Sequence, residues 1–203
     1  EGLKYCEENT VLDSIRGRLL TDLASCYMIE GDIREATSQY LTALDATSKS
    51  GDSEAYLTNC SSLGVAYRRM NLPDSALYYY GKGLEAAMKS KDYSAVSNLH
   101  ANIAVMYISF KQLENAKEHA QEAITYALKE EDALDWLQAY YICGSLLVKT
   151  GEYDQAINYL HKAYGIASQQ QSPRFRLKVL SALLPAFQAT AQDDSVRYYL
   201  NVC

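Results

Sequence analysis

The stretch NLPDSALYYYGKGL, residues 71–84, begins like the end of the chain, AQDDSVRYYLNVC, residues 191–203. Three 40-residue intervals separate their Asp-Ser pairs, and the same interval relates other positions. Small or apolar residues recur in three columns: Ala24, Gly64, Ala104, Gly144 and Leu184; Ala36, Ala76, Ala116, Ala156 and Val196; Tyr40, Tyr80, Ala120, Leu160 and Leu200. Columns that stay in register over five copies indicate one structural unit repeated along the chain.

Each copy has the pattern of two amphipathic helices joined by a short break. In the second copy, apolar residues at helical spacing run from Leu57 to Tyr67, and a second helix is predicted from about Asp74 to Lys89. Pro73 in the break suits the first turn of that second helix. Candidate N-caps, whose side-chain oxygens can accept backbone N–H bonds, stand one period apart at Asp52, Asp92, Asp132 and Ser172. The sequence therefore predicts an all-α chain of about ten helices, nine of them complete.

We expect a single domain over residues 1–203. Its units run roughly over residues 9–50, 51–90, 91–130, 131–170 and 171–203. The last unit is truncated within its second helix, and repeat arrays normally end with a polar capping element. We therefore expect the natural protein to continue beyond Cys203.

Composition and charge argue against several classes of function. The net charge of −6 argues against direct binding of nucleic acid or of anionic membranes, and no apolar run has the length of a membrane span. The five cysteines form no Cys-x-x-Cys pair, and the three histidines are not spaced as a metal site. We interpret His100 as a hydrogen-bonded core histidine, and His119 and Glu122 as exposed. With no phosphate-binding loop or nucleophile elbow, we predict no enzyme activity and no cofactor.

Two stretches carry a resemblance to a known family. LASCYMIEGDIREATSQYLTALDA, residues 23–46, and CGSLLVKTGEYDQAINYLHKAYGIA, residues 143–167, each resemble the tetratricopeptide repeat. Both place a small residue, then an aromatic or large apolar residue, then Gly and an acid at the turn, then Ala, Tyr or Leu, and Ala. The resemblance implies a right-handed α-solenoid of about five tetratricopeptide-like helix pairs. The 40-residue period departs from the usual period of about 34.

In that family the first helix of each pair lines a concave groove that binds peptides or partner helices. The helical phase of the first helices selects the groove positions, since residues opposite the core face of a helix point away from it. In the third copy the groove side also includes Ala101 and Ile108. The candidate site comprises Ser25, Thr58, Ser61, Ser62, Arg68, Asn98, Asn102, Val105, Gln138, Tyr141, Ser145 and Lys178.

These positions are rich in amides and hydroxyls and contain little charge. An amide such as that of Asn102 offers both a donor and an acceptor to an extended peptide backbone. Arg68 and Lys178 are interpreted as lone cations on a solvated face, so a clamp for a carboxylate terminus is not favoured. Tyr80 is expected in the core, while Tyr78 and Tyr79 are expected to point partly outward.

We therefore predict a non-catalytic protein- or peptide-binding repeat domain. Phrases such as DSALYYY and DDSVRYYL are similar to tetratricopeptide segments of bacterial membrane-associated regulators, so a sensory or interaction segment of such a regulator is expected. That resemblance implies a periplasmic location, and without it we expect a cytoplasmic one. The alternative is a structural scaffold that self-associates, for example as a homodimer, through its aromatic convex face or its open C-terminal end.

Overall fold

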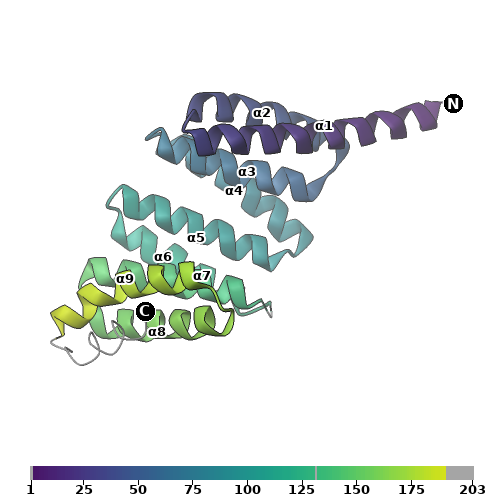
Figure 1. Ribbon diagram of the computed structural model, residues 1–203. Coiled ribbons are helices and arrows are strands. Elements are labelled where there is room, and N and C mark those ends of the chain that lie inside the picture. The colour runs from purple at the N-terminus through teal and green to yellow at the C-terminus, as the bar shows by residue number, and fades with distance from the viewer. Residues whose placement is uncertain (1, 131, 191–203) are drawn as a thin grey trace. The chain divides into compact units, whose positions relative to one another are not determined.

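The structure is a computed structural model that describes residues 2–130 and 132–190. All regular secondary structure in this part of the chain is α-helical (Figure 1). Its helices are α1 (Gly2–Glu30), α2 (Ile33–Ser50), α3 (Ser53–Arg69), α4 (Pro73–Ser90), α5 (Tyr93–Ser109), α6 (Leu113–Ala127), α7 (Ala133–Thr150), α8 (Tyr153–Gln169) and α9 (Pro173–Ala189). The nine complete helices predicted from the sequence are confirmed, and the predicted tenth helix lies outside the described residues.

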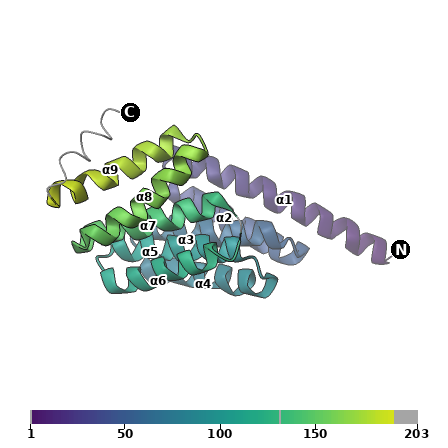
Figure 2. The same ribbon diagram turned by 90° about the horizontal axis from the view of Figure 1, so that it is seen from below.

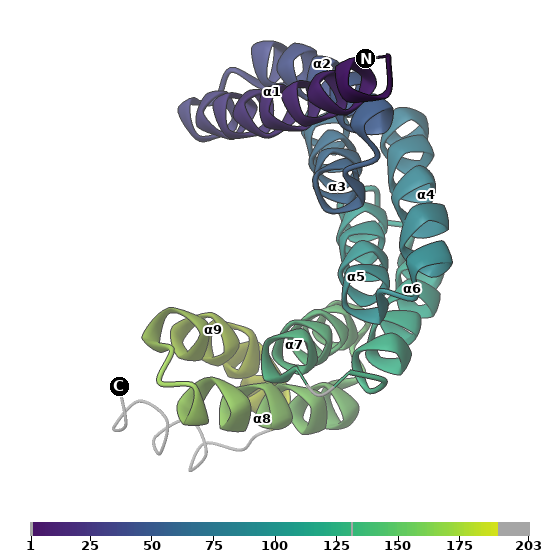
Figure 3. The same ribbon diagram turned by 90° about the vertical axis from the view of Figure 1, so that its right-hand side faces the viewer.

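The chain separates into two compact units, Glu1–Ala95 and Val96–Cys203. Unit 1 contains α1 to α4, and unit 2 contains α6 to α9 together with most of α5. Within unit 1, α1 and α3 form one layer and α2 and α4 the other (Figure 3). Within unit 2, α5, α7 and α9 lie on one side and α6 and α8 on the other. The expectation of a single domain over the whole chain stays a prediction.

The turns between helices recur at half the repeat period. A residue with positive φ ends the preceding helix at Gly31, Gly51, Asn71, Lys91, Lys111, Gly151 and Gln171. This left-handed conformation is a common way to end a helix, and it is easiest for glycine because glycine has no Cβ. The 40-residue period therefore consists of two half-periods that use the same turn.

The predicted helix caps are largely confirmed. The predicted caps Asp52 and Asp132 each accept a backbone N–H bond at the start of the following helix, and the carboxylate of Asp32 does the same at the start of α2. Asp92 does the same for the N–H of Ala95, at 2.9 Å. Ser172 stands at the N-cap of α9, but its side chain makes no capping bond there. Prolines occupy the first turns of α4 and α9, as expected at Pro73 and Pro173.

Unit 1 is held together by the columns read from the sequence. Ala24 of α1, Ala36 and Tyr40 of α2 and Leu63 of α3 form one buried cluster. The Tyr80 ring of α4 packs directly onto the backbone of α3 at Gly64, and Tyr80 is fully buried as predicted. A Cβ added at Gly64 would collide with that ring, so a small residue is required at this position.

Unit 2 uses the same columns with different side chains. At the equivalent of Gly64, a Cβ added at Gly144 of α7 would collide with the Leu160 side chain rather than with an aromatic ring. Ala104, Ala116, Ala120 and other small residues fill the cluster between α5, α6 and α7. The assignment of Ala101 to the groove side is wrong: Ala101 is buried in this same cluster, together with Ala139 of α7. Packing between first helices therefore covers a flank that the helical phase alone left open.

Candidate functional site

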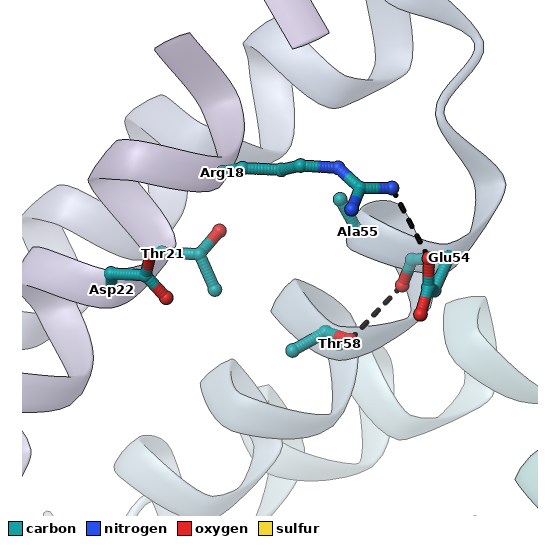
Figure 4. Close-up of a pocket in the computed structure, with 6 residues that line it drawn as sticks. All are labelled: Arg18, Thr21, Asp22, Glu54, Ala55 and Thr58. Carbon is teal, nitrogen blue, oxygen red and sulfur yellow. Dashed lines mark hydrogen bonds and ion pairs between the residues drawn. The ribbon is translucent and has the colours of Figure 1, made fainter. Parts of the chain in front are cut away.

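Unit 1 has a pocket on its first-helix layer, between α1 and α3. Arg18, Thr21 and Asp22 line it from α1, and Glu54, Ala55 and Thr58 line it from α3. Figure 4 shows these six side chains facing one another across the space. The pocket has a volume of about 210 Å³. It includes the predicted groove residue Thr58, whose hydroxyl donates to the backbone oxygen of Glu54 at 3.0 Å.

Arg18 dominates the electrostatics of this pocket. Its guanidinium donates to Asp52 at 2.8 and 3.2 Å and to Glu54 at 3.1 Å. Ser14 also donates to Asp52, at 2.7 Å. The hydrogen bond from Arg18, with that from Ser14, lowers the pKa of Asp52 from 3.8 to about 2, because both favour the ionised carboxylate. Arg18, which lines the pocket, is therefore paired with an ionised Asp52 near neutral pH.

A buried polar pair lies beside the pocket. The Thr21 hydroxyl donates to the side-chain oxygen Oδ1 of Asn59 at 2.9 Å and also contacts the backbone oxygen of Gly17 at 2.8 Å. Asn59 is a fully buried polar residue, whereas the same column in unit 2 contains the apolar residues Ala139 and Val179. Its side-chain nitrogen has no hydrogen-bond partner among the described residues. Since an unpaired buried donor is costly, this position is one that apolar packing does not explain.

Unit 2 has an amide bridge on its first-helix layer. The Asn98 side chain of α5 donates to Asp135 of α7 at 3.0 Å and accepts a bond from Gln138 of α7 at 3.1 Å. Asp135 is only 7% exposed, and its second oxygen has no partner within the described part of the chain. The bridge fixes the orientation of two predicted groove residues, Asn98 and Gln138.

An aromatic and cationic pair lies between α7 and α9. The Lys178 ammonium lies 4.9 Å from the ring centroid of Tyr141 and 5.4 Å from that of Phe175. Lys178 is exposed, as expected of a cation on a solvated face, and its ammonium also makes cation–π contacts with these rings. The arrangement brings two more predicted groove residues, Tyr141 and Lys178, together.

Family models for the tetratricopeptide repeat match residues 16–89, 97–130 and 137–170. Together these matches cover about two thirds of the chain, in both units. The chain belongs to the tetratricopeptide-repeat family. The two 34-residue matches in unit 2 leave residues 131–136 between them, so the first turn of α7 belongs to the lengthening of the repeat.

Several solved structures are similar to this chain in fold. BtubC (BKLC) from P. vanneervenii is 18% identical with a TM-score of 0.77, over 99% of this chain and 89% of that one. A putative kinesin light chain with TPR-like repeats from Podosopora anserina is 18% identical with a TM-score of 0.71, over 93% of each chain. Aspartyl phosphate phosphatase F from Bacillus subtilis is 13% identical with a TM-score of 0.78, over 93% of this chain and 49% of that one. No curated protein is similar enough in sequence to count as a match.

The other predicted groove residues of the tetratricopeptide repeats are distributed over both units. Ser25 is half-buried and bonds the carbonyl oxygen of Thr21 and the hydroxyl of Tyr40, so the pair of α1 and α2 already uses its hydroxyl. Arg68 is half-buried, with its Nε shielded from solvent. Burial raises the pKa of the nearby Tyr80 to about 12, and the Arg68 guanidinium partly opposes this effect. Half-buried positions are also found for Ser61, Ser62, Asn102, Val105 and Ser145.

The histidines of the third tetratricopeptide repeat form a pair that the sequence did not indicate. The Nδ1 atoms of His100 and His119 are 2.9 Å apart, and the rings stack on Tyr126 and Tyr107 respectively. The interpretation of His119 as an exposed residue is wrong, because α6 turns it toward His100 of α5. Burial lowers the pKa of both imidazoles. Within residues 2–130 and 132–190, no group of three or more metal-binding side chains comes together.

A second and larger pocket of unit 1 lies between the N-terminal end of α3 and the C-terminal ends of α2 and α4. It has a volume of about 430 Å³ and lies at the helix ends, lined by residues that include Thr47, Asp52, Tyr56 and Lys89. Its walls come partly from the second helices α2 and α4, which in these repeats carry the outer layer. Size alone therefore does not identify the binding surface.

Sequence reasoning missed the charged side chains of both surfaces. Arg18 lies one period before Thr58 in the column that continues to Asn98, Gln138 and Lys178, so the 40-residue register would have found it. Asp135 and Glu54 precede groove positions by three and four residues, and only their contacts across helices reveal their role.

In the described part of the chain, no helix is both long and apolar enough to cross a membrane.

Proposed function

We propose that the first-helix layer of unit 2 binds an extended peptide segment of a partner protein. Tetratricopeptide repeats are protein-interaction repeats, and this layer offers the chemistry that such a ligand requires. The observation that carries the proposal is the bridge from Asn98 to Gln138, which fixes amide side chains on adjacent first helices. An oriented amide loses little side-chain entropy on binding and can both donate to and accept from a peptide backbone.

Other members of the candidate site extend this surface along the layer. Asn102 lies one helical turn beyond Asn98 on α5, and Val105 adds an apolar contact on the same helix. Tyr141, with Lys178 over its ring, supplies an aromatic platform with a positive charge. A ligand segment with apolar and acidic side chains would complement these groups.

We place this binding domain in a larger bacterial regulator, as its sensory or interaction segment and without catalysis of its own. Support comes from the phrase-level resemblance to such regulators and from the fold shared with aspartyl phosphate phosphatase F of Bacillus subtilis. The proposal implies a periplasmic location if a membrane helix follows in the full protein. Sequencing the coding region beyond Cys203 tests it: an output domain supports the regulator, and a stop codon soon after contradicts it.

A scaffold role is the second candidate, and one observation favours it. Tyr78 on the outer helix α4 is 57% exposed, as expected, with the Lys82 ammonium 4.8 Å from its ring centroid. Tyr79 beside it is half-buried, in agreement with the expectation that it points partly outward, and its ring stacks on Tyr67 with centroids 5.3 Å apart. Under this alternative, Tyr78→Ala would disrupt assembly and leave peptide binding unchanged.

The peptide proposal is tested by selection from a random peptide library followed by calorimetry. Asn102→Ala should weaken the selected peptide by roughly 1–3 kcal/mol, because peptide groups buried against the amide would lose their partner. Asn158→Ala, which removes an exposed amide from the outer helix α8, is the matched control and should leave affinity unchanged. Equal affinities for both variants would remove Asn102 from the binding surface.

A further inference from the structure

Asp135 of α7 does not follow the pattern of its own repeat column. The other four copies have apolar residues at this position of the 40-residue register, at Ile15, Ala55, Ala95 and Phe175. Asp135 is nevertheless buried. Aspartate is rarely buried unless it is paired, and the Oδ2 atom of Asp135 has no hydrogen-bond partner among the described residues. A residue that breaks the local pattern without a gain in packing is expected at functional positions.

The carboxylate of Asp135 determines which way the Asn98 amide points. Asn98 lies on α5 and Asp135 on α7, which are neighbours in the first-helix layer of unit 2, as Figure 2 and Figure 3 show. An ionised carboxylate has no hydrogen to donate, so the Asn98 atom that faces it has to be the nitrogen. The bond of 3.0 Å from Nδ2 of Asn98 to Oδ1 of Asp135 has this direction. The opposite orientation of the amide would bring two oxygens together.

The orientation of Asn98 in turn determines that of Gln138. Because the Asn98 oxygen can only accept, Gln138 presents its nitrogen, and Nε2 donates to Oδ1 of Asn98 at 3.1 Å. The other end of the half-buried Gln138 amide, Oε1, accepts no hydrogen bond within the described part of the chain. We call Asp135, Asn98 and Gln138 the amide relay. Since each bond in such a chain polarises the next, the negative charge of Asp135 makes Oε1 of Gln138 a stronger acceptor.

Unit 1 has the same helix pairs but not the relay. Ala55 stands in the column of Asp135, and Thr58 stands in the column of Gln138. The Thr58 hydroxyl donates to the backbone oxygen of Glu54 in its own helix. A helix pair of this family therefore forms without the relay, which leaves recognition as the reason for a buried carboxylate in unit 2.

We propose that Asp135 is a positioning residue that decides the specificity of unit 2 for its peptide. Through Asn98 it holds the Gln138 oxygen ready for the bound segment. The site then accepts a peptide that brings a backbone N–H to this point and rejects one that brings a carbonyl oxygen, because two acceptors in a dry contact both lose their hydrogen bonds. The inference rests on the proposed peptide binding, whereas the orientation of the two amides does not.

The orientation is tested first in the protein without peptide, by NMR of the side-chain amide groups. In the parent, nuclear Overhauser contacts should join the Asn98 Nδ2 protons to the β protons of Asp135. In the double variant Asp135→Asn/Gln138→Glu, the same protons should contact the γ protons at position 138, because a carboxylate there accepts only and would turn the Asn98 amide round. A parent in which the Asn98 protons contact Gln138 instead of Asp135 would overturn the proposal.

The specificity is tested with a peptide selected on the parent from a random library, and with copies in which one backbone N–H at a time is replaced by an ester oxygen. One replacement should weaken binding to the parent by ~10-fold in calorimetry, because the donor to Gln138 is lost. The same replacement should change affinity by less than ~2-fold in Asp135→Asn, because a neutral amide at this position does not fix the direction of the relay. The double variant should restore the ~10-fold ratio, since its carboxylate is an acceptor in any orientation.

Asp154→Asn is the matched control, because Asp154 is an exposed acid in the first turn of the outer helix α8. It should leave the ester ratio and the Asn98 contacts as in the parent, and circular dichroism should show the same helical signal for all variants. An ester ratio that Asp135→Asn leaves unchanged would overturn the proposal, since a purely structural role weakens every version of the peptide alike. If no selected peptide binds the parent, the proposed function fails and the selectivity with it, while the NMR contacts still show whether the relay exists.

Discussion

The two units use one repeat register but fill it differently. In the column that contains Arg18 and Thr58 in unit 1 and Asn98, Gln138 and Lys178 in unit 2, the first unit builds an open charged pocket and the second an amide bridge. In the hairpin core, a tyrosine ring opposes Gly64, whereas a leucine opposes Gly144. The helices and turns fix where side chains project, while the residues within each column decide what the surface recognises and how tightly the pair packs.

The largest effect is expected in the hairpin core. Gly64→Ala should destabilise the protein by about 1–3 kcal/mol, because the new methyl group would overlap the rigid, fully buried Tyr80 ring. Gly144→Ala should also destabilise the protein, but by less, because the new methyl group would meet the buried Leu160 side chain and the Ala156 backbone oxygen, while alanine favours a helix by about 1 kcal/mol over glycine. Urea unfolding followed by circular dichroism measures both. Equal losses would mean that the ring and the leucine constrain their hairpins alike.

The next effect separates the amide bridge from its counterpart in unit 1. Asn98→Ala should cost roughly 1–3 kcal/mol of unfolding free energy, because it leaves the buried Asp135 carboxylate and the Gln138 amide without their shared partner. Thr58→Ala in the same column should cost less than about 0.5 kcal/mol, since Thr58 is exposed and bonds only its own helix backbone. Chemical denaturation of the two variants compares them directly. An unchanged unfolding free energy in Asn98→Ala would show that the bridge contributes no stability.

Acid should act on the Arg18 pocket in a narrow range of pH. The pKa of Asp52 is lower in the folded protein than in the unfolded chain, so its contribution is present above about pH 4 and is lost as pH falls to about 2. With allowance for the 56% exposure of the Arg18 side chain, the loss should be about 1 kcal/mol. Arg18→Met should flatten the stability profile in that range.

Lys178→Met is the control in the same column, because Lys178 contacts aromatic rings and not a carboxylate. Its stability profile between pH 4 and pH 2 should match the parent, as measured by thermal melts in a series of buffers. The same flattening in both variants would show that the acid sensitivity has another origin.

The smallest effect concerns a stacked aromatic pair that contains a histidine in unit 2 and a tyrosine at the same position in unit 1. Tyr67 stacks on Tyr79 in unit 1, and one period later Tyr107 stacks on His119. The pKa values of His100 and His119 are lowered by burial, so the unfolded chain binds more protons and stability falls as pH drops below about 6.5. His119→Tyr, which copies the residue of unit 1, should lose less stability between pH 7 and pH 5. Melting temperatures at the two pH values decide it, and an unchanged pH dependence would exclude His119 as a source.

Much of the fold follows from the sequence because it depends on local and periodic features. The 40-residue columns, Asp52 at its cap and Pro73 at its helix start require only the spacing along one chain. The phase of a single helix also placed Asn98, Gln138 and Tyr141 on the first-helix layer. It could not show that Asn98 and Gln138 bond each other, since that contact depends on the separation of two helices.

The sequence analysis placed two residues wrongly for the same physical reason. Ala101 is buried because neighbouring first helices pack side by side, which a wheel drawn for one helix does not contain. His119 was assigned to solvent because its partner, His100, lies on the other helix of the pair. Reasoning from one sequence does not show which residues of different helices contact each other. The ion pair between Arg18 and Asp52 is the clearest example.

The regular placement of the turns has a consequence for how this molecule can change in length. The left-handed residues at Gly31, Gly51, Asn71 and their successors are spaced by whole multiples of the half-period, so each helix with its turn takes up the same length of chain. Loss or duplication of one half-period would exchange inner and outer helices and expose their apolar faces. Gain or loss of a whole period would return each side chain to its own layer. The gene can therefore grow or shrink by complete helix pairs and still encode a foldable array.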